Sequence, residues 1–206
     1  MQYIISCLIG YLLGSIPTAY IILKKVKGID ITTIGTGNVG AMNSYEVSNS
    51  KFLGILVFII DFLKGSLSVI VVLYLVDYSF VLAGLSLVFS IFSHCFNPWL
   101  KFKGGRGLAT ALGGTIIVFP FLSVSWIVLW SLTYLIKKDI LIANILATLF
   151  SFIFTLIFYK LAIVYAYPQP ITVNELILFT SSLLLIIFIK HIEPLKEIIS
   201  KNIKKL

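Results

Sequence analysis

The 206-residue chain is 59% hydrophobic and only 12% charged, with a mean hydropathy of +1.07. This composition excludes most classes of soluble protein and predicts an integral membrane protein. The formal net charge of +8 does not indicate nucleic-acid binding, because the basic residues follow the ends of apolar stretches, where they orient membrane proteins.

Apolar stretches along the chain predict seven membrane-spanning helices, since a span takes about 20 apolar residues. The stretch Leu108–Ile136 is too long for one span, and Pro120 divides it, because a proline interrupts a helix. In chain order the seven are Tyr3–Leu23, Phe52–Val76, Ser79–Leu100, the two parts of Leu108–Ile136, Ile140–Tyr159 and Leu176–Ile189. We expect residues 1–206 to form a single all-α membrane domain.

The charges predict how this domain is oriented. With seven spans, nearly all of the 16 Lys and Arg residues fall on one side, which the positive-inside tendency assigns to the cytoplasm. A single span around Pro120 would instead place the basic tail outside. The amino terminus is therefore predicted outside and the carboxyl terminus in the cytoplasm. The first span is expected to be retained, because it lacks a preceding positive residue and a small-x-small cleavage site.

A glycine-rich stretch, GTGNVGAMN, lies in the first cytoplasmic connection, from Gly35 to Asn43. Glycines permit positive φ, and successive backbone N–H groups in that conformation form a concave nest for an anion. The pattern predicts an anion-binding loop.

A second glycine-rich stretch, GGRG from Gly104 to Gly107, precedes the fourth span. Here the N–H groups of a helix start and the Arg106 guanidinium would converge on one point, where a phosphate would fit. The alternative is a plain turn with Arg106 as an orienting cation. The presence of both loops, Lys101 and His191 on one face favours the anion site.

Polar side chains inside the apolar spans are the remaining signal. Asp61 and Lys64, in DFLKG, lie three residues apart on one helical face of the second span, where an unpaired charge is costly. They predict an internal pair, with a structural role favoured over a direct catalytic one. His94 either supports the following loop or is a satisfied helix-end group. Cys7 and Cys95 each lie in an apolar span and indicate neither a disulfide nor a metal site.

Four segments, taken in order, resemble the bacterial glycerol-3-phosphate acyltransferases of the acyl-phosphate-dependent type, as a divergent member. They are SIPTAY, GTGNVGAMN, DFLKG and HCFNPWLKFKGGRGLATALGG, and the resemblance covers nearly the whole chain. It implies transfer of a fatty acyl group from acyl phosphate to the 1-hydroxyl of glycerol 3-phosphate, giving lysophosphatidic acid and phosphate. It also implies no metal or other cofactor, and a multi-pass monomer in the bacterial cytoplasmic membrane with its active face in the cytoplasm.

The resemblance also implies roles for residues. GGRG would bind the phosphate of glycerol 3-phosphate, and the first loop would hold the acyl phosphate. The expected catalytic residues are Thr36, Asn38, Arg106 and His191; the expected substrate-binding residues are Gly35, Gly37, Gly40, Asn43, Lys101, Gly104, Gly105, Gly107 and Thr110; and Asp61, Lys64 and His94 are expected to be structural.

Five positions depart from the family pattern. Thr36 stands for a serine and can still supply a hydroxyl, and Arg106 stands for a lysine and keeps the charge but not the shape. Met42 replaces a threonine, Glu46 an arginine and Pro194 an asparagine, and these three cannot do the same work.

Three hypotheses follow. The first is an acyltransferase whose phosphate contacts have shifted to Lys24, Lys25, Lys51 or Lys101. The second is a relative that has lost or changed its activity, for example one that uses another acceptor. The third is a small transporter or lipid-binding protein, supported only by Asp61 and Lys64.

Overall fold

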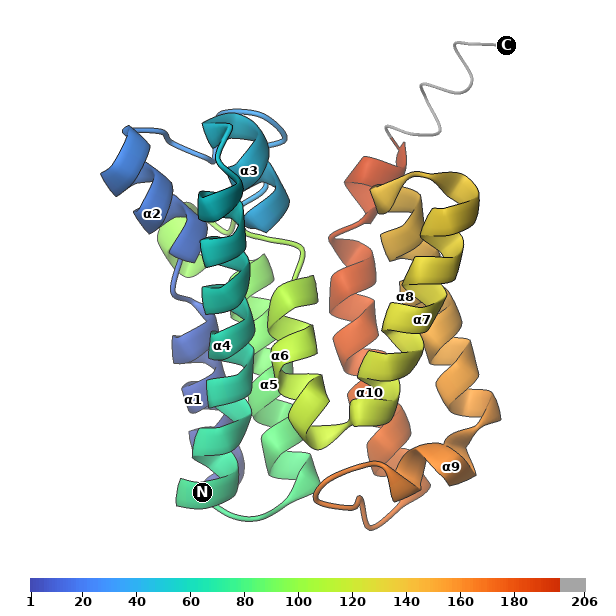
Figure 1. The fold of residues 1–206 in the computed structure, drawn as a ribbon. Coiled ribbons are helices and arrows are strands. Elements are labelled where there is room, and N and C mark those ends of the chain that lie inside the picture. The colour runs from blue at the N-terminus through green and yellow to red at the C-terminus, as the bar shows by residue number, and fades with distance from the viewer. Residues whose placement is uncertain (197–206) are drawn as a thin grey trace.

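The structure is a computed structural model, and it describes residues 1–196 as an all-helical bundle (Figure 1). The predicted all-α fold is confirmed. A short 3-10 helix, Pro98–Leu100, lies between α5 and α6. The α-helices are α1 (Gln2–Gly14), α2 (Thr18–Lys27), α3 (Ala41–Ser48), α4 (Lys51–Leu75), α5 (Phe80–Cys95), α6 (Leu108–Val118), α7 (Pro120–Lys137), α8 (Ile140–Ile157), α9 (Tyr159–Val164) and α10 (Val173–Ile189).

Within the described chain, five segments are long and apolar enough to cross a membrane. They are Gln2–Lys27, Lys51–Leu75, Phe80–Leu100, Pro120–Lys137 and Ile140–Ile157. The other two predicted spans correspond to α6 and α10, which are apolar but have 11 and 17 residues. At 1.5 Å per residue, α6 covers only about 16 Å of an apolar layer about 30 Å thick.

Prolines divide two of the predicted apolar stretches. Pro120 starts α7 directly after α6 has ended at Val118, as predicted. Pro17 also interrupts the first stretch, predicted as one span, and separates α1 from α2. A proline lacks an N–H and disfavours helical geometry at the residue before it.

Side chains from other helices stabilise the break at Pro17. The Asn97 side-chain amide donates to the Ser15 carbonyl at 2.8 Å, and Lys64 Nζ donates to the Ile16 carbonyl at 3.3 Å. The two carbonyl groups at the break thus gain partners inside the bundle, in addition to the Thr18 N–H that donates to Ile16 at 2.9 Å. The break is fixed to α4 and to the segment after α5.

Small residues allow close packing of α4 against α6. A Cβ at Gly65 would meet the Thr110 carbonyl oxygen, and a Cβ at Gly113 would meet the Phe62 carbonyl oxygen. Close approach of backbones through small residues is the usual way in which helices associate in membranes. This contact fixes the start of α6 relative to α4.

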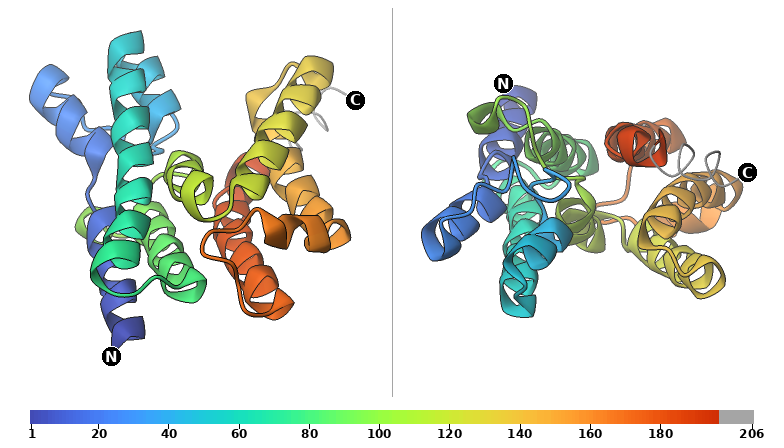
Figure 2. Two further views of the ribbon diagram at one scale, coloured as in Figure 1. Left: turned by 60° about the horizontal axis from the view of Figure 1, so that its bottom comes forward. Right: turned by 90° about the horizontal axis from the view of Figure 1, so that it is seen from above.

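The helices form two groups that lie side by side (Figure 2). The first contains α1, α4, α5 and α6, and the second contains α7 and α8, while α10 contacts both α5 and α8. Helix α1 starts at one end of the bundle, and α3, the 3-10 segment, the α7–α8 turn and the end of α10 lie at the other end (Figure 1). Both glycine-rich loops belong to this second end, which holds the candidate site.

Candidate functional site

The first glycine-rich loop is held in shape by Asn43. Gly35 and Gly37 adopt positive φ of 64° and 67°, as the sequence predicted for this loop. The Asn43 side-chain oxygen accepts from the Thr36 N–H at 3.1 Å, and its amide donates to the carbonyls of Ile34 and Asn38 at 3.3 and 2.9 Å. Asn43 is buried and organises the loop from within.

The second glycine-rich loop packs directly on the first and on α5. The Val39 N–H donates to the Gly104 carbonyl at 3.2 Å, and the Gly105 N–H donates to the His94 carbonyl at 3.1 Å. A side chain at Gly104 would collide with backbone carbonyls at the end of α5, and one at Gly105 with the His94 ring. The first two glycines of GGRG therefore allow close approach to α5, and Arg106 and Gly107 face the pockets.

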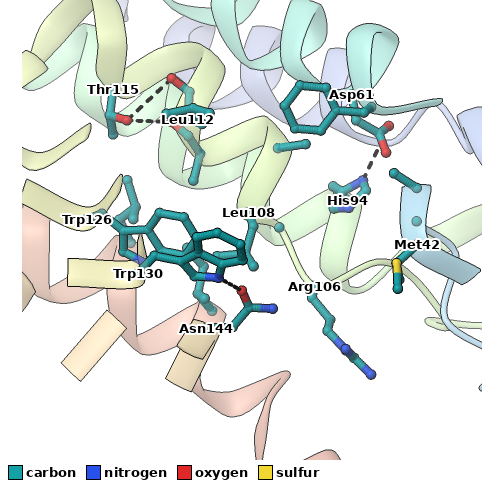
Figure 3. A pocket seen from close by; sticks show the side chains of 18 of the residues that line it. Met42, Asp61, His94, Arg106, Leu108, Leu112, Thr115, Trp126, Trp130 and Asn144 are labelled. Atoms are coloured by element: carbon teal, nitrogen blue, oxygen red, sulfur yellow. Dashed lines mark hydrogen bonds and ion pairs between the residues drawn. The ribbon is translucent and has the colours of Figure 1, made fainter. Parts of the chain in front are cut away.

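A pocket of about 390 Å³ extends from these loops into the bundle; we call it the apolar pocket. Its volume lies within the range of small-molecule sites, roughly 300–1,000 Å³. Asn38, Gly40, Met42, Arg106 and Gly107 line its loop end, together with Asp61 and His94. Most of the remaining wall comes from α6, α7, α8 and α10, through Leu108, Leu112, Thr115, Leu122, Ser123, Trp126, Trp130, Asn144, Leu183, Leu184 and Ile187. Figure 3 shows Thr115 and Arg106 toward opposite ends of it.

Two indole rings form one side of the apolar pocket. Trp126 and Trp130 stack with centroids 6.4 Å apart. Trp126 Nε1 donates to Thr148 at 3.2 Å, and Trp130 Nε1 donates to Asn144 at 2.7 Å; Figure 3 shows the second of these bonds. These bonds satisfy polar atoms within an otherwise apolar wall. The sequence analysis did not predict this wall. Two tryptophans four residues apart, and an asparagine inside the next apolar stretch, were the signals that could have indicated it.

A second pocket of about 360 Å³, the polar pocket, opens on the same loops. Its lining is Thr36, Asn38, Met42, Asn43, Glu46, Arg106, Tyr134, Lys138, Asp139, Ile140 and Leu141. Asn38, Met42, Arg106 and Ile140 line both pockets. An apolar compartment and a polar compartment thus share a boundary at Arg106.

Asp61, Lys64 and His94 form a buried polar cluster beside the apolar pocket. Lys64 Nζ lies 2.8 Å from Asp61 Oδ1 and 2.7 Å from His94 Nδ1. Because an ammonium group only donates, His94 Nδ1 accepts from it. The predicted internal pair is present, and it includes His94. Asp61 and His94 also line the apolar pocket (Figure 3), a placement that the sequence did not predict.

His191 lies just beyond α10 and is buried, close enough to Arg106 to be affected by its charge. Its Nδ1 lies 2.8 Å from the Ile187 carbonyl, so Nδ1 carries the donated proton. Among residues 1–196, Nε2 has no hydrogen-bond partner. Burial, together with the nearby Arg106 charge, lowers the pKa of His191 to about 4, although the Ile187 bond acts in the opposite direction. His191 is therefore a neutral hydrogen-bonding group at physiological pH.

The other predicted site residues lie outside both pocket linings. Lys101 is exposed and Thr110 is buried against α4, and Lys24, Lys25 and Lys51 also lie away from the pockets. Lys138 is the lysine that lines the polar pocket. Within residues 1–196, no group of three or more His, Cys, Asp and Glu side chains is arranged to hold a metal ion.

Comparisons with known proteins agree with one another. A family model described as glycerol-3-phosphate acyltransferase matches residues 4–201. The glycerol-3-phosphate acyltransferase of Helicobacter pylori (strain ATCC 700392 / 26695) is 37% identical over 150 residues, covering 69% of this chain and 67% of that protein. The enzyme of the same name from Pelagibacter ubique (strain HTCC1062) is 38% identical over 159 residues, covering 77% and 81%.

A solved structure has the same fold. The crystal structure of PlsY (YgiH), an integral membrane glycerol 3-phosphate acyltransferase in its glycerol 3-phosphate form, matches with a TM-score of 0.80. The two sequences are 27% identical, and the match covers 98% of this chain and 94% of the other.

Proposed function

Because the chain belongs to the glycerol-3-phosphate acyltransferase family, we propose that it transfers a fatty acyl group from acyl phosphate to the 1-hydroxyl of glycerol 3-phosphate. The products are lysophosphatidic acid and inorganic phosphate. The observation that carries this proposal is the shared boundary of the two pockets at Asn38 and Arg106. An acyl chain fits an apolar compartment, and phosphate-bearing groups fit a polar one.

We propose that the apolar pocket takes the acyl chain and that the loop end faces the cytoplasm. An acyl donor then keeps its chain at bilayer depth while its phosphate reaches the loops. The basic segments near this end, Lys24, Lys25 and Lys27 of α2 among them, support that orientation. So does the start of α1 at the opposite end (Figure 1).

In this proposal the reaction is a direct transfer between the two substrates. The acceptor oxygen attacks the acyl carbonyl carbon, the bond from that carbon to the phosphate oxygen breaks, and the hydroxyl proton ends on the released phosphate. Acyl phosphate already carries a good leaving group, so the protein contributes mainly positioning and charge stabilisation. Thr36, Asn38 and Arg106 line the polar pocket, where both phosphates would bind.

The test is release of phosphate and formation of lysophosphatidic acid by the purified protein given palmitoyl phosphate, with and without glycerol 3-phosphate. We expect both products only when the acceptor is present. Phosphate release without acceptor, or no release from folded protein, would instead support a relative with altered or lost activity.

Arg106→Ala is expected to lower kcat/KM for glycerol 3-phosphate about 100-fold, the effect of removing one partner of a desolvated charge contact. Lys103→Ala is the matched control, because Lys103 lies in the same loop, is exposed and lines neither pocket. Equal effects of the two changes would place the site elsewhere.

A further inference from the structure

The polar pocket brings together charges from three distant parts of the chain. Arg106 comes from the loop before α6, Lys138 from the turn between α7 and α8, and Glu46 from α3. Family resemblance places an arginine at the position of Glu46, so the α3 side of this pocket has a carboxylate in place of a cation. A dianionic ligand in this pocket requires positive charge from another segment.

We propose that Lys138 is a specificity-determining residue, which binds the phosphate of the acceptor together with Arg106 from the side opposite α3. This inference rests on the proposed function, since it names a residue that recognises the acceptor. It replaces the sequence-based hypothesis that Lys24, Lys25, Lys51 or Lys101 supplies the charge.

The position of the Lys138 side chain supports this role. Its ammonium group lies 6.0 Å from the centroid of the Tyr134 ring, and Tyr134 itself lines the polar pocket. A cation held over an aromatic face stays near that face. The neighbouring Lys137, also exposed, lines neither pocket.

The backbone at Lys138 gives no structural reason for a lysine. Lys138 ends α7 with a φ of 54° and a ψ of 26°, in the left-handed region. Glycine is the residue that most often ends a helix in this conformation, because it lacks a Cβ. The fold would accept glycine at this position at least as well as lysine, so the side chain is best explained by what it contacts in the pocket.

The remaining carboxylate of the pocket is already occupied. Asp139 Oδ1 accepts from the N–H groups of Leu141 and Ile142 at 2.8 and 2.9 Å and caps the start of α8. Its charge is therefore directed at the helix amino terminus. Besides Asp139, the charged side chains that line the pocket are Arg106, Lys138 and Glu46, so two cations stand against the one carboxylate that does not cap a helix.

The test compares Lys138→Gly with Lys137→Ala in steady-state kinetics on palmitoyl phosphate and glycerol 3-phosphate. We expect Lys138→Gly to raise KM for glycerol 3-phosphate about tenfold, the effect of one lost charge-assisted contact. Its KM for palmitoyl phosphate should not change. Its melting temperature should equal or exceed that of the native protein, because glycine suits the backbone, and this separates a binding role from a structural one. Lys137→Ala should behave as the native protein.

A double variant that moves the positive side chain to the α3 side of the pocket provides a second test. In the double variant Glu46→Arg with Lys138→Gly, a cation returns on the α3 side, and we expect KM for glycerol 3-phosphate to come back to within about threefold of the native value. The proposal is overturned if Lys138→Gly and Lys137→Ala have the same KM for glycerol 3-phosphate.

Failure of the proposed function would be recognised separately, as native protein that is folded but forms no lysophosphatidic acid. In that case the same variants are compared by calorimetric titration with glycerol 3-phosphate and with inorganic phosphate. Weaker binding by Lys138→Gly than by Lys137→Ala would still support the role of Lys138. Equal binding, or no binding by the native protein, would overturn it.

Discussion

Helices α5 and α7 both border the apolar pocket region, but they are embedded to very different extents. In the segment Phe80–Leu100, which includes α5, 67% of an apolar stretch of 18 residues is buried inside the protein. In α7 the corresponding share is 17%. Close packing and internal polar contacts hold α5 with α1, α4 and α6, and this first group carries both glycine-rich loops. Helix α7 presents most of its surface outward and only its inner face to the pocket. The difference indicates that the first group fixes the end that carries the two loops, while the second group provides one wall of the apolar pocket, the compartment that we propose for the acyl chain.

Breaking the buried cluster of the first group should have the largest effect. Asp61→Asn would leave the Lys64 charge without its carboxylate partner, and the two side chains are only 3% and 4% exposed. Loss of one partner of a buried pair costs about 3–5 kcal/mol. We expect that loss in the free energy of unfolding, measured by denaturant titration in detergent.

The matched change in the second group is Asp139→Asn, which alters the cap of α8. We expect a loss of about 1 kcal/mol or less there, as for other helix caps. Equal losses for the two variants would contradict the contrast between the groups.

Overpacking the α4–α6 contact should have the next largest effect. Gly65→Leu would force a side chain against the Thr110 carbonyl, and we expect a loss of about 3 kcal/mol. Val124→Leu on α7, where the side chain is 60% exposed, should change stability by less than about 0.5 kcal/mol. Thermal unfolding of the two variants in the same detergent would measure this, and comparable shifts would refute it.

Filling the apolar pocket should alter donor preference more than stability. Leu112→Phe on α6 adds volume to the lining (Figure 3). We expect the ratio of kcat/KM for palmitoyl phosphate to that for decanoyl phosphate to fall about tenfold, since a few methylenes are worth 1–3 kcal/mol in such pockets. Ile116→Phe is the control, because Ile116 lies on the same helix, is 48% exposed and lines neither pocket. An unchanged ratio in Leu112→Phe would argue that the acyl chain binds elsewhere.

The smallest effect concerns pH. The folded-state pKa of His191 is lowered to about 4 from 6.5, so between these values the unfolded chain binds a proton that the folded chain does not. Stability therefore falls as the pH drops through this window, by about 1.2 kcal/mol at pH 5.5 relative to pH 7. His191→Gln should lose less stability than the native protein between pH 7 and pH 5.5 in melting experiments. A parallel loss in both proteins would show that His191 does not contribute to acid sensitivity.

The sequence by itself determined the class of fold and the composition of the two loops. Span length and the break at Pro120 are local properties, because an apolar stretch and a proline act on their own segment. The same holds for the positive φ of Gly35 and Gly37 and for the internal pair of Asp61 and Lys64, which are neighbours on one helical turn.

Only the tertiary structure decided which groups share a pocket. Nothing in the sequence shows that Gly104 and Gly105 pack on the end of α5, or that Asp61 and His94 reach the apolar pocket. Nor does it show that Lys138 and Glu46 line the same pocket, while Lys101 lines neither. These placements depend on how helices that are distant in the chain pack against each other, as α4 packs against α6 at Gly65 and Thr110. The charged side chains at the loops come together only because the helices pack in this way.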